Sequence, residues 1–321
     1  MQSKDYLIGA DEAGLTVLDF LRRLGYSSTL IKRVKATGIT LNGTAVTVRA
    51  RLGEGDLLSV SFPSESSEGI LQVKLPIQIL YEDGELLAVF KPSGIPTHPA
   101  KGTGVLTLAN IVCAYLKGEC VFRAVNRLDT DTAGIVLIAK TPLAASLVGE
   151  QMRRREIEKR YLALTSGIPE PRIGKIDAPI ARECEGSQRR AVREGGQEAV
   201  SEYRVLSVFE GNAVCEVRPR TGRTHQIRVH MAHIGHPLVG DFLYGTETPS
   251  GYRLVCFSLS LRHPTSGKPL EITLPSPISY ILPPTEAGDG QKNPIKRGYA
   301  APRFSRVCLE AGSFGSESDT K

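Results

Sequence analysis

The stretch "RLDTDTAGIVLIAK", from Arg127 to Lys140, places an acid beside an arginine and just ahead of an unbroken apolar run. Such a run is typical of a buried strand. Asp129 is therefore expected in a turn at the mouth of a buried strand, where a rigid scaffold can aim a catalytic carboxylate. A purely structural alternative fits the same residues: of Asp129 and Asp131, one pairs with Arg127 and the other caps the turn. The stretch alone favours this structural alternative.

The composition limits the classes of protein that the chain can belong to. It has 321 residues, a hydrophobic fraction of 41% and a formal net charge of +6, which permits a polyanionic partner without requiring one. The six cysteines are scattered and form no C-x-x-C pair. No signal peptide or apolar stretch of membrane-spanning length is evident. We therefore expect a soluble, cytoplasmic protein that acts without a membrane, in a reducing compartment.

Residues 1–63 predict a small module of two helices and a hairpin. "LTVLDFLRRLG" carries a helical apolar stripe that ends at Gly25, and "TLIKRVKATG" predicts a helix from an N-cap at Thr29 to Gly38. Asn42-Gly43 predicts the turn of the hairpin. A solvated helix face is the commoner explanation for basic residues of this kind, but their number favours a phosphate-binding face. These residues are Arg22, Arg23, Lys32, Arg33 and Lys35.

A polar linker at 64–72 separates this module from a larger domain at 73–285, and a flexible tail is expected at 286–321. The larger domain predicts hairpins at Asp83-Gly84 and Gly211-Asn212, and a helix capped by Thr141 with Pro142 at its first position. Many hairpins with few helices predict an α+β fold whose central sheet is mixed and largely antiparallel, flanked by helices and loops.

The segment "PRTGRTHQIRVH", Pro219 to His230, gathers arginines at the start of a predicted helix with Thr224 as its N-cap and Gly235 as its C-cap. A helix N-terminus favours anions, and arginine forks suit phosphate or carboxylate. Three apolar residues recur at helical spacing and should face the core: Ile227, Met231 and Ile234. Arg228 adjoins that stripe, so we expect it to be partly buried and to need an anionic partner. Asp129 is the candidate.

Histidines cluster in the same region, which raises the alternative of a zinc-dependent hydrolase. His225 and His230 are five residues apart, however, so they do not share a helical face, and no His-Glu pair is present. The phosphate-binding, dinucleotide-binding and acyl-transfer signatures are also missing. The residues therefore do not favour a metal site.

Four segments together resemble the RluA-type pseudouridine synthase family and occur in that family's order. They are "YEDGELLAVFKPSGIPTHP", "RLDTDTAGIVLIAK", "EKRYLALTSG" and "PRTGRTHQIRVHMAHIGHPLVGDFLYG". The resemblance covers about Leu15 to Pro275. The N-terminal module resembles the α-L RNA-binding domain, a ribosomal-protein-like module that many family members carry in front of the catalytic domain.

The resemblance implies an isomerase that converts uridine to pseudouridine within structured RNA, with no cofactor. Asp129 matches the catalytic aspartate, Tyr161 matches the tyrosine that stacks on the target base, and Arg228 matches the basic residue that pairs with the aspartate. Ile227 matches an aliphatic residue beside the pocket, and Arg127 matches the arginine that fills the vacated base stack. Thr132 and Arg223 complete the residues that we expect to contact the substrate.

Large-subunit ribosomal RNA is the expected substrate, with transfer RNA as the alternative. A non-catalytic RNA-binding or ribosome assembly factor is an alternative of another class. A monomer is expected. Four positions depart from the commonest family pattern, which bears on the target site rather than on the chemistry. Asn126 and Cys256 each stand where the family pattern has a histidine. Ala133 stands where it has a serine, and Phe90 stands where it has an asparagine.

Overall fold

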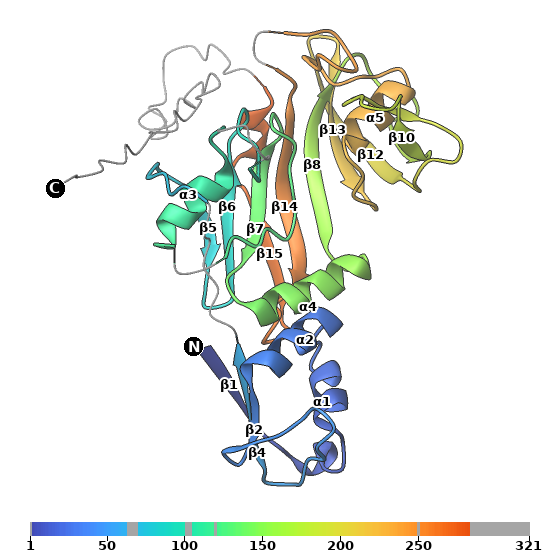
Figure 1. Ribbon diagram of the computed structural model, residues 1–321. Coiled ribbons are helices and arrows are strands. Elements are labelled where there is room, and N and C mark those ends of the chain that lie inside the picture. Colours follow the sequence, from blue (N-terminus) through green and yellow to red (C-terminus); the bar gives the residue numbers. More distant parts are fainter. Residues whose placement is uncertain (1, 63–69, 100–104, 119–120, 249–250, 283–321) are drawn as a thin grey trace, which may run out of the picture.

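A computed structural model of the chain describes residues 2–62, 70–99, 105–118, 121–248 and 251–282 (Figure 1). Its main feature is a nine-stranded sheet in the order β5-β6-β7-β14-β8-β13-β12-β9, with β15 also paired to β14. The strands are β5 (Ile79–Glu82), β6 (Leu86–Lys91), β7 (Ala133–Ala139), β8 (Glu158–Thr165), β9 (Ile173–Asp177), β12 (Val200–Phe209), β13 (Asn212–Pro219), β14 (Leu254–Arg262) and β15 (Pro269–Thr273). The tail predicted at 286–321 lies outside the described residues.

The sheet is mixed, as the sequence predicts. Among the described strands, β7 and β14 form the one parallel pair, and the other neighbours run antiparallel. The strand expected after the Asp129 turn is β7, which lies between β6 and β14 in the interior of the sheet. The α+β fold class is therefore confirmed.

Both faces of the sheet are covered, which explains the unbroken apolar run of β7. Val136 and Ile138 enter one core together with α3 (Leu108–Tyr115), whereas Ile135 and Leu137 enter a second core together with Val148. Val148 belongs to α4 (Pro142–Arg153), which begins at the predicted Thr141 cap. Successive strand residues point to opposite faces, so a strand buried on both sides needs apolar residues at every position.

At the far end of the sheet, α5 (Gln226–His233) and the small hairpin of β10 (Ile180–Arg182) and β11 (Arg190–Val192) lie beside β12 and β13 (Figure 1). A 3-10 helix, η2 (Pro277–Tyr280), follows β15. In the described part of the chain, no helix has the length and apolar character needed to cross a membrane.

The N-terminal residues form a separate four-stranded sheet in the order β1-β4-β2-β3 with a core of their own. Its elements are β1 (Gln2–Leu7), η1 (Ala10–Glu12), α1 (Val17–Arg23), α2 (Ser28–Thr37), β2 (Ile39–Leu41), β3 (Thr44–Ala45) and β4 (Leu57–Phe62). The predicted turn is confirmed, since Asn42 and Gly43 both have positive φ, as a two-residue hairpin turn requires. We propose that the division at residue 63 separates two domains.

The N-terminal module contacts the rest of the chain through α4 (Figure 1). The hydroxyl of Ser146 accepts a hydrogen bond from the backbone N–H of Ser27 at 2.8 Å and donates one to the carbonyl of Gly25 at 3.0 Å. Leu143 joins the core of the module, and Leu147 packs against it. Helix α4 of the larger domain thus contacts the module through both hydrogen bonds and apolar packing.

Several sequence predictions need correction. Ser27, not Thr29, caps α2, since its hydroxyl accepts the N–H of Leu30. His225, not Thr224, is the N-cap of α5 and has φ 58°. The β12–β13 turn is Glu210-Gly211, because Asn212 already belongs to β13.

Five strands of the structure were not predicted from the sequence. β1 is polar and is recruited by backbone pairing to β4, while β9 to β11 are short and mostly part-exposed. β14 was also missed, although it connects the two halves of the main sheet.

The close approach of β7 and β14 depends on a glycine. Gly134 has φ 127°, and a Cβ atom there would lie 2.3 Å from the carbonyl oxygen of Cys256. We predict that Gly134→Ala lowers the free energy of unfolding by about 3 kcal/mol or more, because backbone cannot yield as a flexible side chain can. Urea unfolding measures this.

Gly149→Ala is the matched control. Gly149 lies inside α4 with no atom within 4 Å of the added Cβ. This substitution should raise the free energy of unfolding by up to about 1 kcal/mol, as expected for alanine in a helix. Equal effects of the two substitutions would contradict the proposed constraint at the β7–β14 pair.

Candidate active site

The turn that carries Asp129 is held by its own backbone and by the end of β6. The N–H of Thr132 donates to the carbonyl of Asp129 at 3.1 Å. The carbonyl of Thr130 accepts from the N–H of Gly94 and from Nζ of Lys91, both at 2.9 Å. The Asp129 side chain keeps 32% of its surface exposed. It is therefore a carboxylate on a fixed turn that solvent or a ligand can still reach.

Lys91 is a buried cation that sequence reasoning did not assign to the site. Its Nζ donates to three carbonyls, those of Pro92, Ile95 and Thr130, at 2.7–2.9 Å. Burial lowers the pKa of Lys91 to about 7, although the nearby Asp131 and Asp129 raise it. The three acceptors match the three protons of an ammonium group, so this geometry favours the charged form. The feature of the sequence that could have identified Lys91 is the Lys-Pro dipeptide at the end of a buried strand.

Two further side chains fix the residues before Asp129. The hydroxyl of Thr97 donates to the carbonyl of Leu128 at 3.0 Å and accepts its N–H at 3.2 Å. Asn126 donates to the carbonyl of Ile135 and accepts the N–H of Leu137, both at 2.9 Å. The asparagine that departs from the family pattern is therefore a buried clamp on β7.

Arg228 has a different principal partner from the one that the sequence predicts. Its Nε and Nη2 atoms make a bidentate pair with Asp241, at 2.7 Å for each bond, and both side chains are buried. Its Nη1 atom lies 3.9 Å from Oδ2 of Asp129. Arg228 thus links the two aspartates, and its hydrogen bonds go to Asp241. Asp241 was missed because it follows α5 in a loop without apolar periodicity.

Asp241 also organises the loop that surrounds the arginine. Its Oδ1 accepts the N–H groups of Leu243 at 3.0 Å and Tyr244 at 3.3 Å. The guanidinium carbon of Arg228 lies over the rings of Tyr252 at 4.3 Å, Tyr244 at 5.0 Å and Phe242 at 5.7 Å. Burial alone would lower the pKa of Arg228, but the hydrogen bonds and charge of Asp241 raise it. Arg228 therefore stays a cation.

Tyr161 lies on β8, beside Cys256 of β14, and is buried. Burial raises its pKa well above 10, and the neighbouring Cys256 and Asp129 raise it further. Tyr161 is therefore a neutral phenol at working pH. Burial also raises the pKa of the Cys256 thiol to about 11, so this cysteine is not a thiolate.

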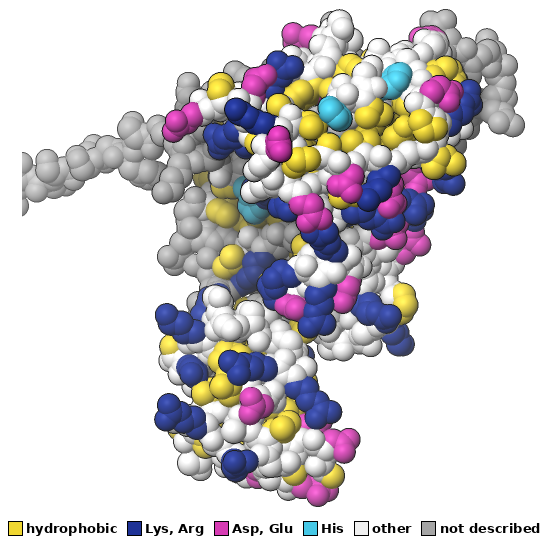
Figure 2. All heavy atoms as spheres, turned by 90° about the vertical axis from the view of Figure 1, so that its right-hand side faces the viewer, with side chains coloured by type: hydrophobic (Ala, Val, Ile, Leu, Met, Phe, Trp, Pro, Cys, Tyr) yellow, Lys and Arg dark blue, Asp and Glu magenta, His cyan; other side chains and the backbone are white. Residues whose placement is uncertain are grey.

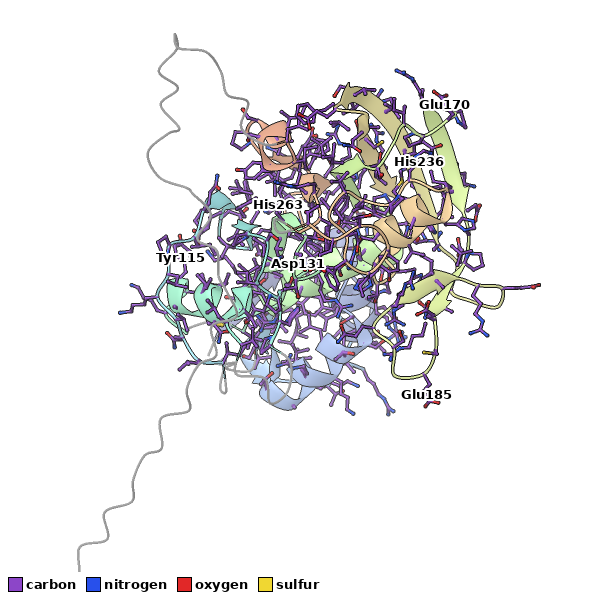
Figure 3. All side chains as sticks on the ribbon, turned by 90° about the horizontal axis from the view of Figure 1, so that it is seen from above. Tyr115, Asp131, Glu170, Glu185, His236 and His263 are labelled. Atoms are coloured by element: carbon purple, nitrogen blue, oxygen red, sulfur yellow. The ribbon has the colours of Figure 1, made fainter. Side chains whose placement is uncertain are left out.

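Asp131 lies close to the same group of charges, at the centre of the larger domain in the view from above (Figure 3). Burial raises the pKa of its carboxyl group, while Lys91 and Arg228 lower it. The turn thus presents two carboxyl groups, of which Asp131 is the one whose pKa burial raises.

The remaining predicted substrate residues have varied surroundings. Arg127 is exposed, and Ile227 is buried in the core beside Met231, as the helical spacing predicts. The hydroxyl of Thr132 is buried and lies 3.1 Å from that of Tyr252. Arg223 donates through Nε to the carbonyl of Glu198 at 2.9 Å. Figure 2 shows Lys and Arg side chains spread over the surface of the N-terminal module. The five predicted basic residues of α1 and α2 are all exposed: Arg22, Arg23, Lys32, Arg33 and Lys35.

Gln226 fixes the start of α5, and sequence reasoning missed it. Its carbonyl oxygen accepts from the hydroxyl of Thr221 at 2.7 Å and the N–H of Arg223 at 3.0 Å. Its amide nitrogen donates to the carbonyl of Val200 and the hydroxyl of Ser201 on β12. All the polar groups of this buried amide are satisfied, which holds the Arg228 helix to the sheet.

The histidines near α5 have separate partners. His225 lies 2.9 Å from the hydroxyl of Tyr244, and His230 lies between the hydroxyl of Ser201 and the carbonyl of Ala178. His236 contacts the carbonyl of Ser166. In the described ranges, no three His, Cys, Asp or Glu side chains come close enough together to hold a metal ion.

The arrangement joins a reachable carboxylate to a fixed cation and a neutral phenol, next to aromatic rings. Such a set can stabilise charge and move protons on a ring-shaped, polar substrate. Comparison with known proteins also points to an enzyme that acts on a nucleic-acid base. Residues 85–233 match the family model described as RNA pseudouridylate synthase.

An uncharacterized RNA pseudouridine synthase of Bacillus subtilis, YjbO, is 35% identical over 271 residues, which cover 82% of this chain and 96% of that relative. The chain belongs to the RluA-type family of RNA pseudouridine synthases. It is an isomerase that acts on RNA. The family predicted from the four sequence segments is confirmed.

Two further relatives extend the comparison. Ribosomal large subunit pseudouridine synthase D of Pseudomonas aeruginosa is 38% identical over 221 residues, covering 68% of this chain and 69% of that relative. The solved structure of human RNA Pseudouridylate Synthase Domain Containing 1 is 29% identical, with a TM-score of 0.52, and covers 63% of this chain and 84% of that one. The synthase fold is therefore shared with an experimentally determined relative.

The buried Arg228–Asp241 pair leads to a stability prediction. Asp241→Asn should lower the free energy of unfolding by about 3–5 kcal/mol, because it leaves a buried guanidinium without its counter-charge. Turnover on RNA should fall as well, since Nη1 of Arg228 is no longer held toward Asp129. Urea unfolding and an assay of pseudouridine formation in RNA measure the two effects.

Glu198→Gln is the control for that substitution. Glu198 pairs with Arg155 at 3.0 Å, and both side chains are more than half exposed. Its loss should change stability by less than about 1 kcal/mol. If Asp241→Asn were as mild as Glu198→Gln, Asp241 would not be the residue that holds Arg228.

Proposed function

We propose that this synthase isomerises specific uridines in large-subunit ribosomal RNA, with Asp129 as the essential catalytic group. The observation that carries the proposal is the placement of Asp129: a reachable carboxylate on a rigid turn, 3.9 Å from a fixed arginine and within electrostatic reach of a buried tyrosine. The choice of RNA is supported by relatives at 35–38% identity that are named ribosomal large subunit pseudouridine synthase D.

The reaction rearranges one nucleoside without gain or loss of atoms. The N1–C1′ bond breaks, the uracil turns within the site, C5 bonds to C1′ and the C5 proton moves to the ring nitrogen. Asp129 acts at the sugar, either by attacking C1′ or by removing the 2′ proton. Arg228 provides a permanent positive charge beside the carboxylate, and Asp241 prevents that charge from moving.

Tyr161 acts on the base as a neutral phenol. Its ring offers a stacking surface, and its hydroxyl receives the C5 proton while passing on its own. A phenolate is not available, because burial keeps the pKa of Tyr161 far above neutrality. The hydroxyl therefore works as a relay.

The target base must leave its stack to reach Asp129, which costs a few kcal/mol. Arg127 is exposed two residues before Asp129, in a position to enter the space that the base vacates. Basic residues elsewhere offset the cost through contacts with flanking phosphates. The exposed cations of α1 and α2 supply such contacts if the module binds RNA as its resemblance implies.

We predict that Asp129→Asn lowers turnover roughly 10³-fold or more, because the amide can neither attack C1′ nor remove a proton. Pseudouridine mapping of total RNA would compare cells with the intact gene, without it, and with Asp129→Asn alone. One or a few ribosomal uridines should lose modification in both defective strains. Asp177→Asn, which removes an exposed carboxylate paired with Lys175, is the control and should leave all sites modified.

The same map separates the alternatives. Loss of modification confined to transfer RNA would replace the ribosomal substrate with that one. An Asp129→Asn strain that retains every modification, while the deletion strain loses none, would leave a non-catalytic RNA-binding role as the function to test.

We predict that Tyr161→Phe keeps RNA affinity and loses most turnover, because the stacking ring remains while the hydroxyl is removed. The raised pKa of Tyr161 adds a second expectation: the pH–rate profile of the native enzyme should show no limb from this phenol below about pH 10. Single-turnover rates from pH 6 to 10 measure both. Full activity of the variant would remove Tyr161 from proton transfer.

A further inference from the structure

A cavity of about 420 Å³ opens between the β10–β11 hairpin and the segment that leads into α5. Its walls carry three arginines, Arg182, Arg190 and Arg223, and none of its lining residues is acidic. Gly195 and Gly196 form another part of the wall, and a Cβ atom at Gly195 would meet no other group within 4 Å. The cavity is separate from the residues assigned above to the reaction, apart from Arg223.

These arginines differ from most arginines of the larger domain. Arg155, Arg160, Arg204, Arg218 and Arg220 each lie within salt-bridge distance of a glutamate. Within the described ranges, no carboxylate lies within that distance of the three cavity arginines. Nε of Arg190 is also buried without any hydrogen-bond partner. A buried donor without a partner is unfavourable, so this wall is suited to an anion from outside the chain.

The cavity is connected to the catalytic carboxylate through Tyr244. The N–H of Arg190 donates to the hydroxyl of Tyr244 at 2.8 Å, and the same ring lies 5.0 Å from the guanidinium carbon of Arg228. Arg228 in turn reaches Asp129. Two residues in contact, Tyr244 and Arg228, therefore connect the cavity wall to the proposed reaction centre.

We propose that this cavity binds a backbone phosphate of the RNA strand next to the target uridine. The proposal rests on the proposed function, because it takes Asp129 as the position of that uridine. The arginine forks of Arg182 and Arg190 hold the phosphate oxygens, and the neighbouring start of α5 adds favourable partial charge. The β10–β11 hairpin thus fixes the path of the RNA strand past the site.

The test measures the affinity of the full chain for an unmodified large-subunit ribosomal RNA transcript as a function of salt. Arg182→Ala should raise the Kd roughly three- to tenfold and reduce the slope of log K against log salt. Arg190→Lys keeps the charge but loses the planar fork, so it should raise the Kd to a similar extent with little change in the slope. The loss of one phosphate contact on a single strand corresponds to about 0.7 in that slope. Arg182 is exposed and has no carboxylate partner, so its replacement does not threaten folding.

Arg172→Ala is the matched control. Arg172 is an exposed arginine just before β9, beside Glu170, which lies at the periphery of the molecule (Figure 3). Its replacement should leave both the Kd and the slope unchanged. If Arg182→Ala and Arg190→Lys behave like Arg172→Ala, the phosphate site is refuted.

A second measurement distinguishes RNA from a small anion. Calorimetry with inorganic phosphate alone would detect a small-anion site. Phosphate binding that depends on Arg182, combined with unchanged RNA affinity, would overturn the RNA assignment. These experiments measure affinity and not turnover. If the phosphate site is wrong, the arginine substitutions leave RNA affinity unchanged. If the proposed function is wrong, RNA binds but no pseudouridine forms.

Discussion

The pairing of Arg228 with Asp241 is the interaction on which the site depends. A guanidinium has two edges to offer, and here Asp241 takes both bonds of one edge, which leaves Nη1 facing Asp129. The charge is already neutralised inside the protein, so Asp129 need not be consumed as a counter-ion and remains 32% exposed. An arginine paired only with Asp129 would hold that carboxylate in an ion pair. Asp241 therefore leaves Asp129 available to a substrate.

The surroundings of this pair come from three distant parts of the chain. The turn before β7 supplies Asp129, β8 supplies Tyr161, and α5 with its following loop supplies Arg228 and Asp241. β14 lies between β7 and β8 and sets their separation, which is why a glycine at position 134 matters for a site that it does not touch. The buried clamps at Lys91, Thr97 and Asn126 then remove the remaining freedom of the turn. Rigid support of this kind is what precise placement of a reacting group requires.

Sequence reasoning found what is encoded locally. The turn at Asp129, the buried strand after it and the helix that begins at Thr141-Pro142 all follow from short-range patterns and are confirmed. Asp241 could not be assigned as the partner of Arg228, because the pairing depends on how a loop folds back over α5. The role of Lys91 could not be predicted either, since only the fold shows that three carbonyls converge on it. β1 has no apolar alternation and becomes a strand only because β4 offers an edge.

The clamp at Asn126 has a consequence for how the enzyme responds to its surroundings. The resemblance places a histidine at this position in most relatives, and an imidazole changes its charge and its hydrogen-bonding pattern near neutrality. An amide has no proton to gain or lose, so its two bonds to β7 are the same in acidic and neutral conditions. In this chain the hydrogen bonds that Asn126 makes to β7 therefore do not vary with pH, and Lys91, whose pKa burial lowers to about 7, is the ionisable anchor of the Asp129 turn.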